Sequence, residues 1–238
     1  MSCVVEAISL NTPDEVLKEL SDEFESCPPQ EVLRWALAEF GHDVALATGF
    51  GAEGCVLVDM LARIDARARI FYLDTHVLFP EAYELRDHLV ARYGVRFERH
   101  ATTLTLDAQA ARHGERLWES NPNECCRIRK IEPLKEALSG LTAWMTAIRR
   151  DQSPARARAG IVERDAKFGV LKINPLAAWS SRDVWNYIFK HDVPYNPLHD
   201  LGYTSIGCQP CTTPISADED PRAGRWRGKC KAECGLHQ

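Results

Sequence analysis

The fold is decided by residues 43–63, which read DVALATGFGAEGCVLVDMLAR. A short apolar run from Asp43 to Thr48 ends in the glycine-containing turn 49–54, and a helical pattern of apolar residues follows from Cys55 to Arg63. A strand followed by a tight loop and then by a helix is the repeating unit of α/β proteins.

The same unit recurs along the chain. Further strands are predicted at Arg69–Leu73, Val95–Arg99 and Ala143–Ile148, and further helices at Pro80–Tyr93, Glu124–Leu138 and Ser180–Lys190. Before the first strand, a capping box at Thr12 predicts a helix to about Ser26, and Pro29–Phe40 predicts a second. This alternation predicts an α/β fold whose parallel sheet has helices on both faces. From Pro194 onward, dense Pro, Gly and Cys predict an irregular C-terminal segment.

The composition is that of an ordinary globular protein. The 238 residues are 45% hydrophobic and 26% charged, which excludes collagen-like, low-complexity and disordered classes. No apolar run is long enough to span a bilayer, and the first ten residues hold no Lys or Arg that would open an export signal. A cytoplasmic protein without a membrane partner is therefore expected.

The charge is distributed unevenly. A net charge of -5 argues against a general nucleic-acid binder. Residues 1–31 hold eight acidic residues and one lysine, whereas residues 222–231 hold five basic residues and no acid. The basic stretch suits a small anionic ligand or an acidic partner; the alternative is a solvated tail.

Ligands of parallel sheets bind at the carboxyl ends of the strands, here the turns after Thr48, Leu73 and Ile148. The first turn opens a helix, where backbone N–H groups can hold phosphate, although it lacks the Gly-Lys-Ser/Thr ending of a Walker A loop. A plain tight turn explains it equally well. After Ile148, Arg149-Arg150-Asp151-Gln152-Ser153 brings two guanidinium groups that suit a phosphate clamp or a surface salt-bridge cluster.

Nine cysteines are many for a cytosolic chain, and several are grouped. Cys125-Cys126 and Cys208-Gln-Pro-Cys211 are two close pairs that a fold can bring together as four soft ligands. Adjacent helical cysteines diverge by about 100°, which suits the corners of a [4Fe-4S] cube better than one zinc ion. Zinc and inert thiols remain open alternatives.

The tail 231–238 places Cys234 four residues from the end, beside the basic stretch. Such a thiol is expected to have a lowered pKa, to be accessible and to move between two positions. A mobile nucleophile and a spare surface thiol both fit this pattern.

Five segments together resemble the signature segments of the assimilatory adenylyl-sulfate (APS) reductase family, in the same order. They are LDTHVLFPEAY at 73–83, CCRIRK at 125–130, RRDQS at 149–153, CQPC at 208–211 and ECGLH at 233–237. The resemblance spans about residues 45–237. It implies an adenine nucleotide alpha-hydrolase-like fold and a thioredoxin-dependent reductase that converts APS to sulfite and AMP through an enzyme S-sulfocysteine.

The resemblance also assigns roles to residues. The family's nucleophile corresponds to Cys234, and its [4Fe-4S] ligands correspond to Cys125, Cys126, Cys208 and Cys211. Its substrate contacts correspond to Thr48, Gly49, Phe50, Gly51, Glu53, Leu73, Asp74, Thr75, Lys130, Arg149, Arg150, Asp151, Gln152, Ser153, Arg156, Arg222, Arg225 and His237. Three parts are then expected: an acidic helical segment 1–42, an α/β nucleotide-binding reductase domain with the cluster at 43–212, and a basic, partly mobile catalytic tail 213–238.

Relatives that use the 3'-phosphorylated substrate (PAPS) typically lack both cysteine pairs, so the resemblance favours APS. Reduced thioredoxin is the implied electron donor. The sequence leaves open whether the chain forms a homo-oligomer. The alternatives are PAPS reductase activity and an iron–sulfur redox sensor that uses residues 222–231 on nucleic acid, which leaves Cys234 unexplained.

This chain departs from the family pattern at four positions. Gly49 and Gly54 stand where the family more often has Ser and Asp, and a lost hydroxyl could weaken a phosphate hydrogen bond. His76 stands where the family usually has Gly, after Asp-Thr. Cys230 is an extra thiol four residues before Cys234, so that a disulfide between the two is conceivable on oxidation.

Overall fold

The computed structural model describes residues 7–231 and 233–237. Its strands are β1 (Val44–Thr48), β2 (Ile70–Leu73), β3 (Phe97–His100), β4 (Ala143–Met145), β5 (Val162–Asp165) and β6 (Val170–Ile173). Its α-helices are α1 (Asp14–Phe24), α2 (Pro29–Phe40), α3 (Ala52–Ile64), α4 (Pro80–Tyr93), α5 (Leu106–His113), α6 (Leu117–Ser120), α7 (Pro122–Cys126), α8 (Glu132–Leu138) and α9 (Ser181–His191). Shorter turns are η1 (Gly41–Asp43), η2 (Arg127–Ile131), η3 (Arg150–Gln152), η4 (Pro154–Arg156), η5 (Pro197–Leu201) and η6 (Gln209–Cys211).

The six strands form one sheet in the order β3-β2-β1-β4-β6-β5. All neighbouring strands are parallel except β5, which pairs with β6 in the antiparallel sense. The chain runs outward from β1 through β2 to β3 and then returns to β4 on the other side of β1. The strand order therefore reverses between β1 and β4, and their carboxyl ends border the crevice where such sheets bind ligands.

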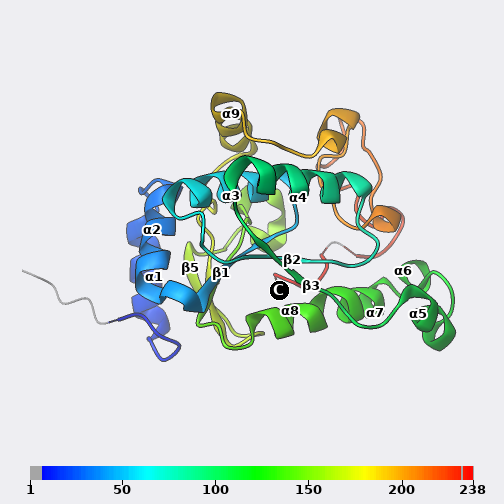
Figure 1. The fold of residues 1–238 in the computed structure, drawn as a ribbon, viewed down its shortest axis with the longest axis horizontal. Coiled ribbons are helices and arrows are strands. Elements are labelled where there is room, and N and C mark those ends of the chain that lie inside the picture. Colours follow the sequence, from blue (N-terminus) through cyan, green and yellow to red (C-terminus); the bar gives the residue numbers. More distant parts are fainter. Residues whose placement is uncertain (1–6, 232, 238) are drawn as a thin grey trace, which may run out of the picture.

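Side chains alternate between two cores, one on each face of the sheet. Leu46 and Met145 belong to the core beneath α2, α3, α4 and α9, whereas Ala45 and Trp144 belong to the core beneath α8. Figure 1 shows α3 and α4 on one side of the sheet and α8 on the other. The predicted α/β class with helices on both faces is confirmed.

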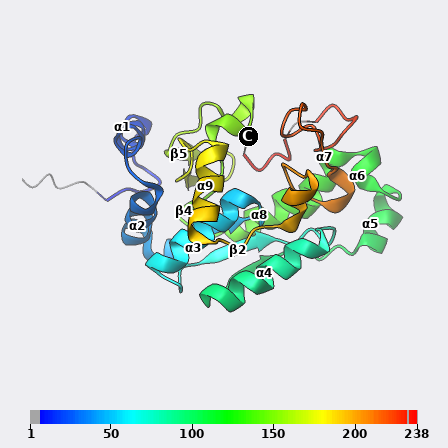
Figure 2. The same ribbon diagram turned by 90° about the horizontal axis from the view of Figure 1, so that it is seen from above.

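The first of the two N-terminal helices covers the antiparallel edge of the sheet. α1 packs against β5, and the two helices lie at that end of the molecule in Figure 2. The hydroxyl of Ser21 accepts a hydrogen bond from the Ile161 N–H at 2.7 Å, and Arg164 forms an ion pair with Asp14 at 2.8 Å. A covered edge strand cannot pair with a second chain.

Two predictions about the sheet are corrected. It is not wholly parallel, because of β5, and neither β5 nor β6 was expected. Both strands have only four residues and contain charged side chains such as Glu163, Arg164 and Lys172, so they show no apolar run. The strand predicted at Val95–Arg99 is β3, which begins two residues later and ends one residue later, and the strand predicted to reach Ile148 ends at Met145.

Two helix predictions are also corrected. Thr12 forms no capping box: the residue before α1 is Pro13, and the Thr12 hydroxyl accepts from the Ser9 N–H at 2.9 Å. The single helix predicted at Glu124–Leu138 is divided into α7, a π-helical turn η2, and α8. Pro133 lacks an N–H and its ring excludes the carbonyl four residues earlier, which favours the wider turn before it. The predicted capping role of Ser180 is confirmed, with Asp183 as its partner.

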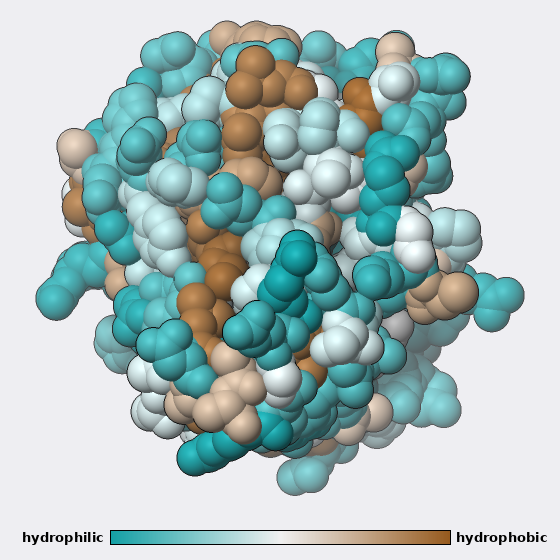
Figure 3. Space-filling view, turned by 90° about the vertical axis from the view of Figure 1, so that its right-hand side faces the viewer, coloured by the Kyte–Doolittle hydropathy of each residue, from teal (hydrophilic) through white to brown (hydrophobic). Residues whose placement is uncertain are grey.

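The C-terminal segment is irregular, as predicted, and two bridges tie it down. Leu78 bridges to Cys208, and Thr212 bridges to Arg225. Figure 3 shows that the end of the molecule formed by this segment and α5–α7 is mostly hydrophilic, with a narrow hydrophobic strip. Within the part of the chain that the structure describes, no helix is both long and apolar enough to cross a membrane. The division into residues 1–42, 43–212 and 213–238 stays a prediction, and residues 1–6, 232 and 238 of it lie outside the described residues.

Candidate active site

An ion pair joins the loops on the two sides of the crevice. The guanidinium of Arg149, after β4, lies 3.1 Å from the carboxylate of Glu53, which is in the first turn of α3. Beside them, the Thr48 hydroxyl accepts from the Phe50 N–H at 3.1 Å, and a Cβ atom added at Gly49 would meet nothing within 4 Å. The loop backbone thus borders open space at the helix N-terminus, as a nucleotide phosphate site requires.

The loop after β4 sends its arginines in different directions. Arg149 donates to Asp151 Oδ1 at 3.0 Å, and Arg156 donates to the side-chain oxygen of Gln152 at 2.5 Å. Arg150 instead forms an ion pair with Glu25 and donates to the carbonyl of Ala159 at 2.7 Å. Its predicted substrate contact therefore has no support in the geometry.

The loop after β2 is organised around Asp74. Its carboxylate accepts from the His76 N–H at 2.8 Å, from the Tyr83 hydroxyl at 2.8 Å and from Arg99 at 2.7 Å. Burial raises the pKa of Asp74, but these three partners lower it more, so the carboxylate is ionised. His76 takes a left-handed φ of 59°, the conformation for which glycine is best suited. Asp74 thus stabilises the loop through the three hydrogen bonds that its carboxylate accepts.

The four paired cysteines line one cavity. Cys125 and Cys126 come from the end of α7, and Cys208 and Cys211 come from the ends of η6. The Gln209 N–H donates to the carbonyl of Val77 at 2.8 Å, which ties η6 to the loop after β2. The cavity lining comprises Val77, Trp118, Pro122, Cys125, Cys126, Arg129, Lys130, Cys208, Pro210, Cys211 and Trp226.

Three of the free thiols in this cavity, those of Cys125, Cys126 and Cys211, are weak acids. Burial, with a smaller contribution from the neighbouring sulfurs, raises the pKa of Cys125 to about 12 and that of Cys211 to about 11. Burial also raises the pKa of Cys126. Coordination to a metal would deprotonate such thiols outright. Within residues 7–231 and 233–237, no three His, Cys, Asp or Glu side chains form a group that could hold a single metal ion.

Two buried cations adjoin the cysteines. Arg129 is 1% exposed, and its hydrogen bonds to Gln109, Thr75 and Leu104 end on neutral oxygens. Burial lowers the pKa of Arg129. Burial also lowers the pKa of Lys130, but the sulfurs of Cys208 and Cys234 raise it more, so the ammonium stays charged. The cationic side chains of Arg129 and Lys130 are therefore buried beside the cysteine sulfur atoms.

Cys234 lies in the same charged region, and its acidity differs from that of the paired cysteines. Burial raises the pKa of its thiol, but the charge of Lys130, the Leu236 N–H and the charge of Arg225 together lower it below the usual value. The lowered pKa agrees with the prediction. The thiol is less accessible than predicted, because the side chain is partly buried rather than exposed.

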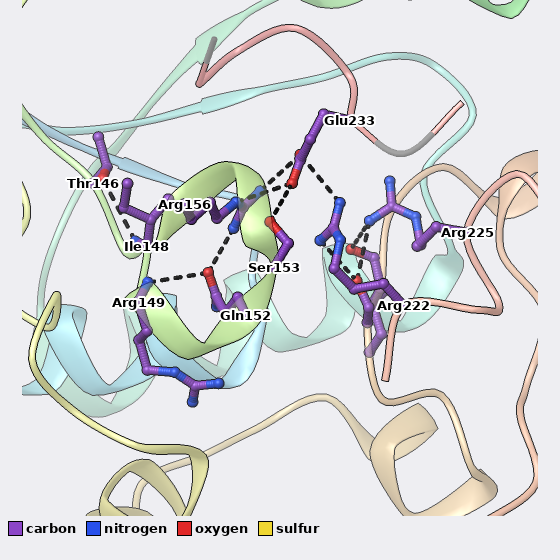
Figure 4. A network of polar contacts seen from close by, with 11 residues as sticks. Thr146, Ile148, Arg149, Gln152, Ser153, Arg156, Arg222, Arg225 and Glu233 are labelled. Carbon is purple, nitrogen blue, oxygen red and sulfur yellow. Dashed lines mark hydrogen bonds and ion pairs between the residues drawn. The ribbon is translucent and has the colours of Figure 1, made fainter. Parts of the chain in front are cut away.

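The tail around Cys234 is docked by side chains on both sides of it. Figure 4 shows the Glu233 carboxylate between Arg156 and Arg222, with Ser153 close by and the Arg149 guanidinium turned away. The ion-pair distances are 2.9 Å to Arg156 and 3.1 Å to Arg222. On the other side of Cys234, His237 stacks on Trp144 of β4 with ring centroids 5.6 Å apart.

Arg225 is held beside the same site. Its guanidinium donates to the Ile206 carbonyl at 3.3 Å and lies over the Trp226 ring, 4.6 Å from the centroid. A Cβ atom at Gly207 would stand 2.2 Å from the Arg225 guanidinium, so the glycine leaves room for the guanidinium in this position.

The structure therefore brings most of the predicted residues together and separates Arg150 from them. The sequence analysis gave no role to Glu233, Arg129 or Trp144. Two signals were available: Glu233 is an acid two residues after the basic stretch, and Arg129 lies between cysteines and a lysine in the CCRIRK segment. Trp144 gave no signal, because an aromatic residue in a buried strand is ordinary core.

Comparison with known proteins identifies the family. A family model described as the phosphoadenosine phosphosulfate reductase domain matches residues 43–214. The chain is 50% identical over 222 residues to an adenosine 5'-phosphosulfate reductase of Salinibacter ruber, covering 93% of this chain and 88% of that one. It is 42% identical over the full length of both chains to a phosphoadenosine 5'-phosphosulfate reductase of Gloeobacter violaceus.

A solved structure agrees with the fold. The crystal structure of phosphoadenylyl-sulfate reductase from Candida auris superposes with a TM-score of 0.77 at 33% identity, covering 87% of this chain and 100% of that one. Sequence motifs, sheet topology and relatives thus converge, and the resemblance stated from the sequence is confirmed. The chain belongs to the phosphoadenosine phosphosulfate reductase domain family and is an enzyme of that family.

Proposed function

We propose that this enzyme reduces APS to sulfite and AMP, with Cys234 as the nucleophile and reduced thioredoxin as the electron donor. The observation that carries the proposal is the position of Cys234, between the ion pairs of Glu233 with Arg156 and Arg222 and the stack of His237 on Trp144. The charges of Lys130 and Arg225 act on its thiol there. A thiolate in a cationic, partly buried site is suited to attack an anionic sulfur centre.

The substrate's nucleotide fits the crevice between β1 and β4. The loop 48–54 offers backbone N–H groups at the start of α3, and Arg149 lies across the crevice from it. Arg156, Arg222 and Arg225 stand nearer to Cys234, where the sulfate end of the substrate would have to lie. These cations would reduce the repulsion between a thiolate and a sulfate.

The first step is a displacement at sulfur. The Cys234 thiolate forms a bond to the sulfur of APS, the bond from that sulfur to the bridging phosphate oxygen breaks, and AMP leaves with the electron pair. The nearby guanidinium groups stabilise the charge that develops on the departing phosphate. The product on the enzyme is S-sulfocysteine at Cys234.

The second step needs a protein thiol. A thioredoxin thiolate attacks the sulfur of Cys234, sulfite leaves with the bonding electrons, and a mixed disulfide forms. The second thioredoxin thiol then attacks that disulfide and releases the Cys234 thiolate, so that thioredoxin is oxidised by two electrons. This order requires the tail to present Cys234 first to the substrate and then to a partner.

The cysteine cavity suits a [4Fe-4S] cluster bound by Cys125, Cys126, Cys208 and Cys211. Two observations support the fit. Among the described residues, the buried guanidinium of Arg129 forms no ion pair with a carboxylate: it contacts oxygens of Gln109, Thr75 and Leu104 and the ring nitrogen Nδ1 of His76. A net negative group would compensate its charge. Trp118 and Trp226 line the cavity, and their buried indole N–H groups lack a described hydrogen-bond partner. When bound, the cluster would supply charge that helps to polarise the sulfate end beside Lys130, not electrons for the substrate.

A single-turnover experiment tests the function. Enzyme incubated with sulfur-labelled APS and no thioredoxin should carry one label per chain at Cys234 and release an equal amount of AMP. Reduced thioredoxin should then discharge the label as sulfite. A parallel reaction with PAPS tests the alternative substrate, which the Gloeobacter violaceus relative's name favours. Label on Cys230, or sulfite release from Cys234→Ser at a normal rate, would show that the nucleophile is assigned wrongly.

A further inference from the structure

The residue directly before the proposed nucleophile is a buried carboxylate. The Glu233 side chain is 4% exposed, and it is shared by two guanidinium groups whose side chains are 10% exposed in Arg156 and 15% exposed in Arg222. Arg156 approaches both carboxylate oxygens, with its Nε 3.1 Å from Oε1 and its terminal nitrogen 2.9 Å from Oε2. The Ser153 hydroxyl donates to Oε1 at 3.2 Å. The carboxylate is therefore paired and hydrogen-bonded, as a buried charge must be.

This network crosses between distant parts of the chain. Arg156 and Ser153 belong to the loop after β4, at the edge of the crevice, whereas Glu233 belongs to the C-terminal tail (Figure 4). A second group of contacts holds the tail just after Cys234: Lys167 donates to the Gly235 carbonyl at 2.6 Å, and His237 stacks on Trp144. Cys234 thus lies between two anchors, and Glu233 supplies the first.

The two anchors differ in kind. The anchor after Cys234 consists of a backbone carbonyl and a ring stack, together with Leu236 packed on the core beneath α8. The anchor before Cys234 is ionic, directional and shared with two arginines that are predicted substrate contacts. Bidentate carboxylate–guanidinium contacts set orientation as well as energy. The geometry of the Cys234 sulfur relative to the substrate site therefore depends on the Glu233 carboxylate.

We propose that Glu233 is a positioning residue: its carboxylate docks the tail on Arg156 and Arg222 and so sets Cys234 for attack on the bound substrate. The inference rests on the proposed function, because it assumes that Cys234 is the nucleophile. Glu233 touches neither the reacting sulfur nor the nucleotide in this role and acts through the backbone that joins it to Cys234. Loss of the carboxylate leaves two neighbouring guanidinium groups without their shared anion, so the tail loses its ionic anchor.

The closing experiment compares Glu233→Gln with Glu219→Gln. Glu219 is a matched control, since it also pairs with a tail arginine, Arg227, but that pair is on the surface, with side chains 30% and 46% exposed. Iodoacetamide is added to holoenzyme without thioredoxin, and alkylation of Cys234 is followed by peptide mass spectrometry. Glu233→Gln should increase the alkylation rate by about 10-fold or more, because the undocked tail exposes the thiol. Glu219→Gln should match the wild type.

The same variants are then tested for the sulfur transfer and for AMP binding. At saturating APS, Glu233→Gln should form the Cys234 adduct about 10-fold or more slowly than the wild type, a change in kcat rather than in KM. AMP should bind to this variant at least as tightly as to the wild type, because removing a negative charge beside Arg156 and Arg222 does not weaken the binding of an anion. Glu233→Asp keeps the charge and should recover part of the rate, which shows that the anchor is ionic even if Glu233→Gln folds poorly.

Each outcome decides the proposal. Alkylation of Glu233→Gln at the wild-type rate, or adduct formation at the wild-type rate, overturns the docking role. Faster adduct formation with tighter APS binding would make Glu233 a competitor of the substrate and would also overturn it. If the wild-type enzyme forms no adduct at Cys234, the proposed function itself fails, and the alkylation result still reports whether Glu233 holds the tail.

Discussion

Gly54 lies directly against the hydroxyl of Thr48: a Cβ atom added at Gly54 would stand 2.6 Å from Thr48 Oγ1. The same hydroxyl accepts from the Phe50 N–H and so shapes the turn between β1 and α3. The first turn of α3 therefore packs closely against the end of β1, and glycine at position 54 avoids a clash with the Thr48 hydroxyl.

Gly54→Ala tests this match. Alanine is the better helix former by about 1 kcal/mol, yet here the added methyl group overlaps a buried hydroxyl and should lower the free energy of unfolding by about 1–3 kcal/mol. Urea denaturation provides the measurement. The double variant Thr48→Ala/Gly54→Ala removes the overlap and should be more stable than Gly54→Ala alone. Equal or greater stability of Gly54→Ala relative to the wild type would contradict the close contact.

Cys208→Ser tests the cluster. The wild-type protein purified without oxygen should be brown and contain about four iron atoms per chain. Cys208→Ser should lose iron and activity together, because one of the four thiolate ligands is missing. Cys230→Ser is the control and should keep its iron, since Cys230 is exposed and lies outside the cavity. Colourless wild-type protein that holds stoichiometric zinc would exclude the cluster.

The pH dependence of adduct formation tests the acidity of Cys234. Lys130, the Leu236 N–H and Arg225 hold its pKa below the usual value, against the opposing effect of burial. The thiolate is the nucleophile, so the single-turnover rate should rise with pH through this lowered pKa and stay level above it. Arg225→Gln removes one cation and should move the rise to higher pH. A rise unchanged by that substitution would show that Arg225 does not act on the thiol.

Arg222 and Arg225 are expected to bind the anionic part of the substrate. Arg222→Ala or Arg225→Ala should raise the dissociation constant of APS by roughly 10-fold or more, about 1.4 kcal/mol, because each removes a charge-assisted contact. Arg150→Ala should leave the constant unchanged, since Arg150 pairs with Glu25 at the end of α1. Isothermal titration calorimetry measures all three variants. If Arg150→Ala weakens binding as much as the other two, the loop after β4 binds substrate differently from the arrangement described.

Asp74→Asn tests the loop after β2. Burial raises the folded-state pKa of Asp74, but Arg99, the His76 N–H and Tyr83 lower it more. The ionised carboxylate therefore stabilises the fold above the unfolded pKa of about 3.9, and this stabilisation is lost as the pH falls through the lower folded-state pKa. At neutral pH the substitution should cost about 1–3 kcal/mol of unfolding free energy. The difference from the wild type should shrink below about pH 4. A difference that does not change with pH would mean that the charge of Asp74 is not what stabilises the loop.

The sequence by itself determined much of this protein, wherever the signal was local. The alternation of apolar strands with helices reported the class of fold, because each such element is defined by a periodicity within about a dozen neighbouring residues. The turn at 49–54, the two cysteine pairs and the segment at 233–237 were visible for the same reason. Each is a short pattern that can be recognised without knowing what lies beside it in space.

The tertiary structure alone decided which residues meet. β5 and β6 could not be recognised, since strands of four residues with charged side chains are stable only through pairing and through the cover of α1. Arg149 and Arg150 are adjacent in sequence, yet one faces Glu53 across the crevice and the other faces Glu25, because neighbouring side chains leave the backbone in different directions. The role of Glu233 follows from two arginines that lie 77 and 11 residues away, and such a contact exists only once the chain has folded.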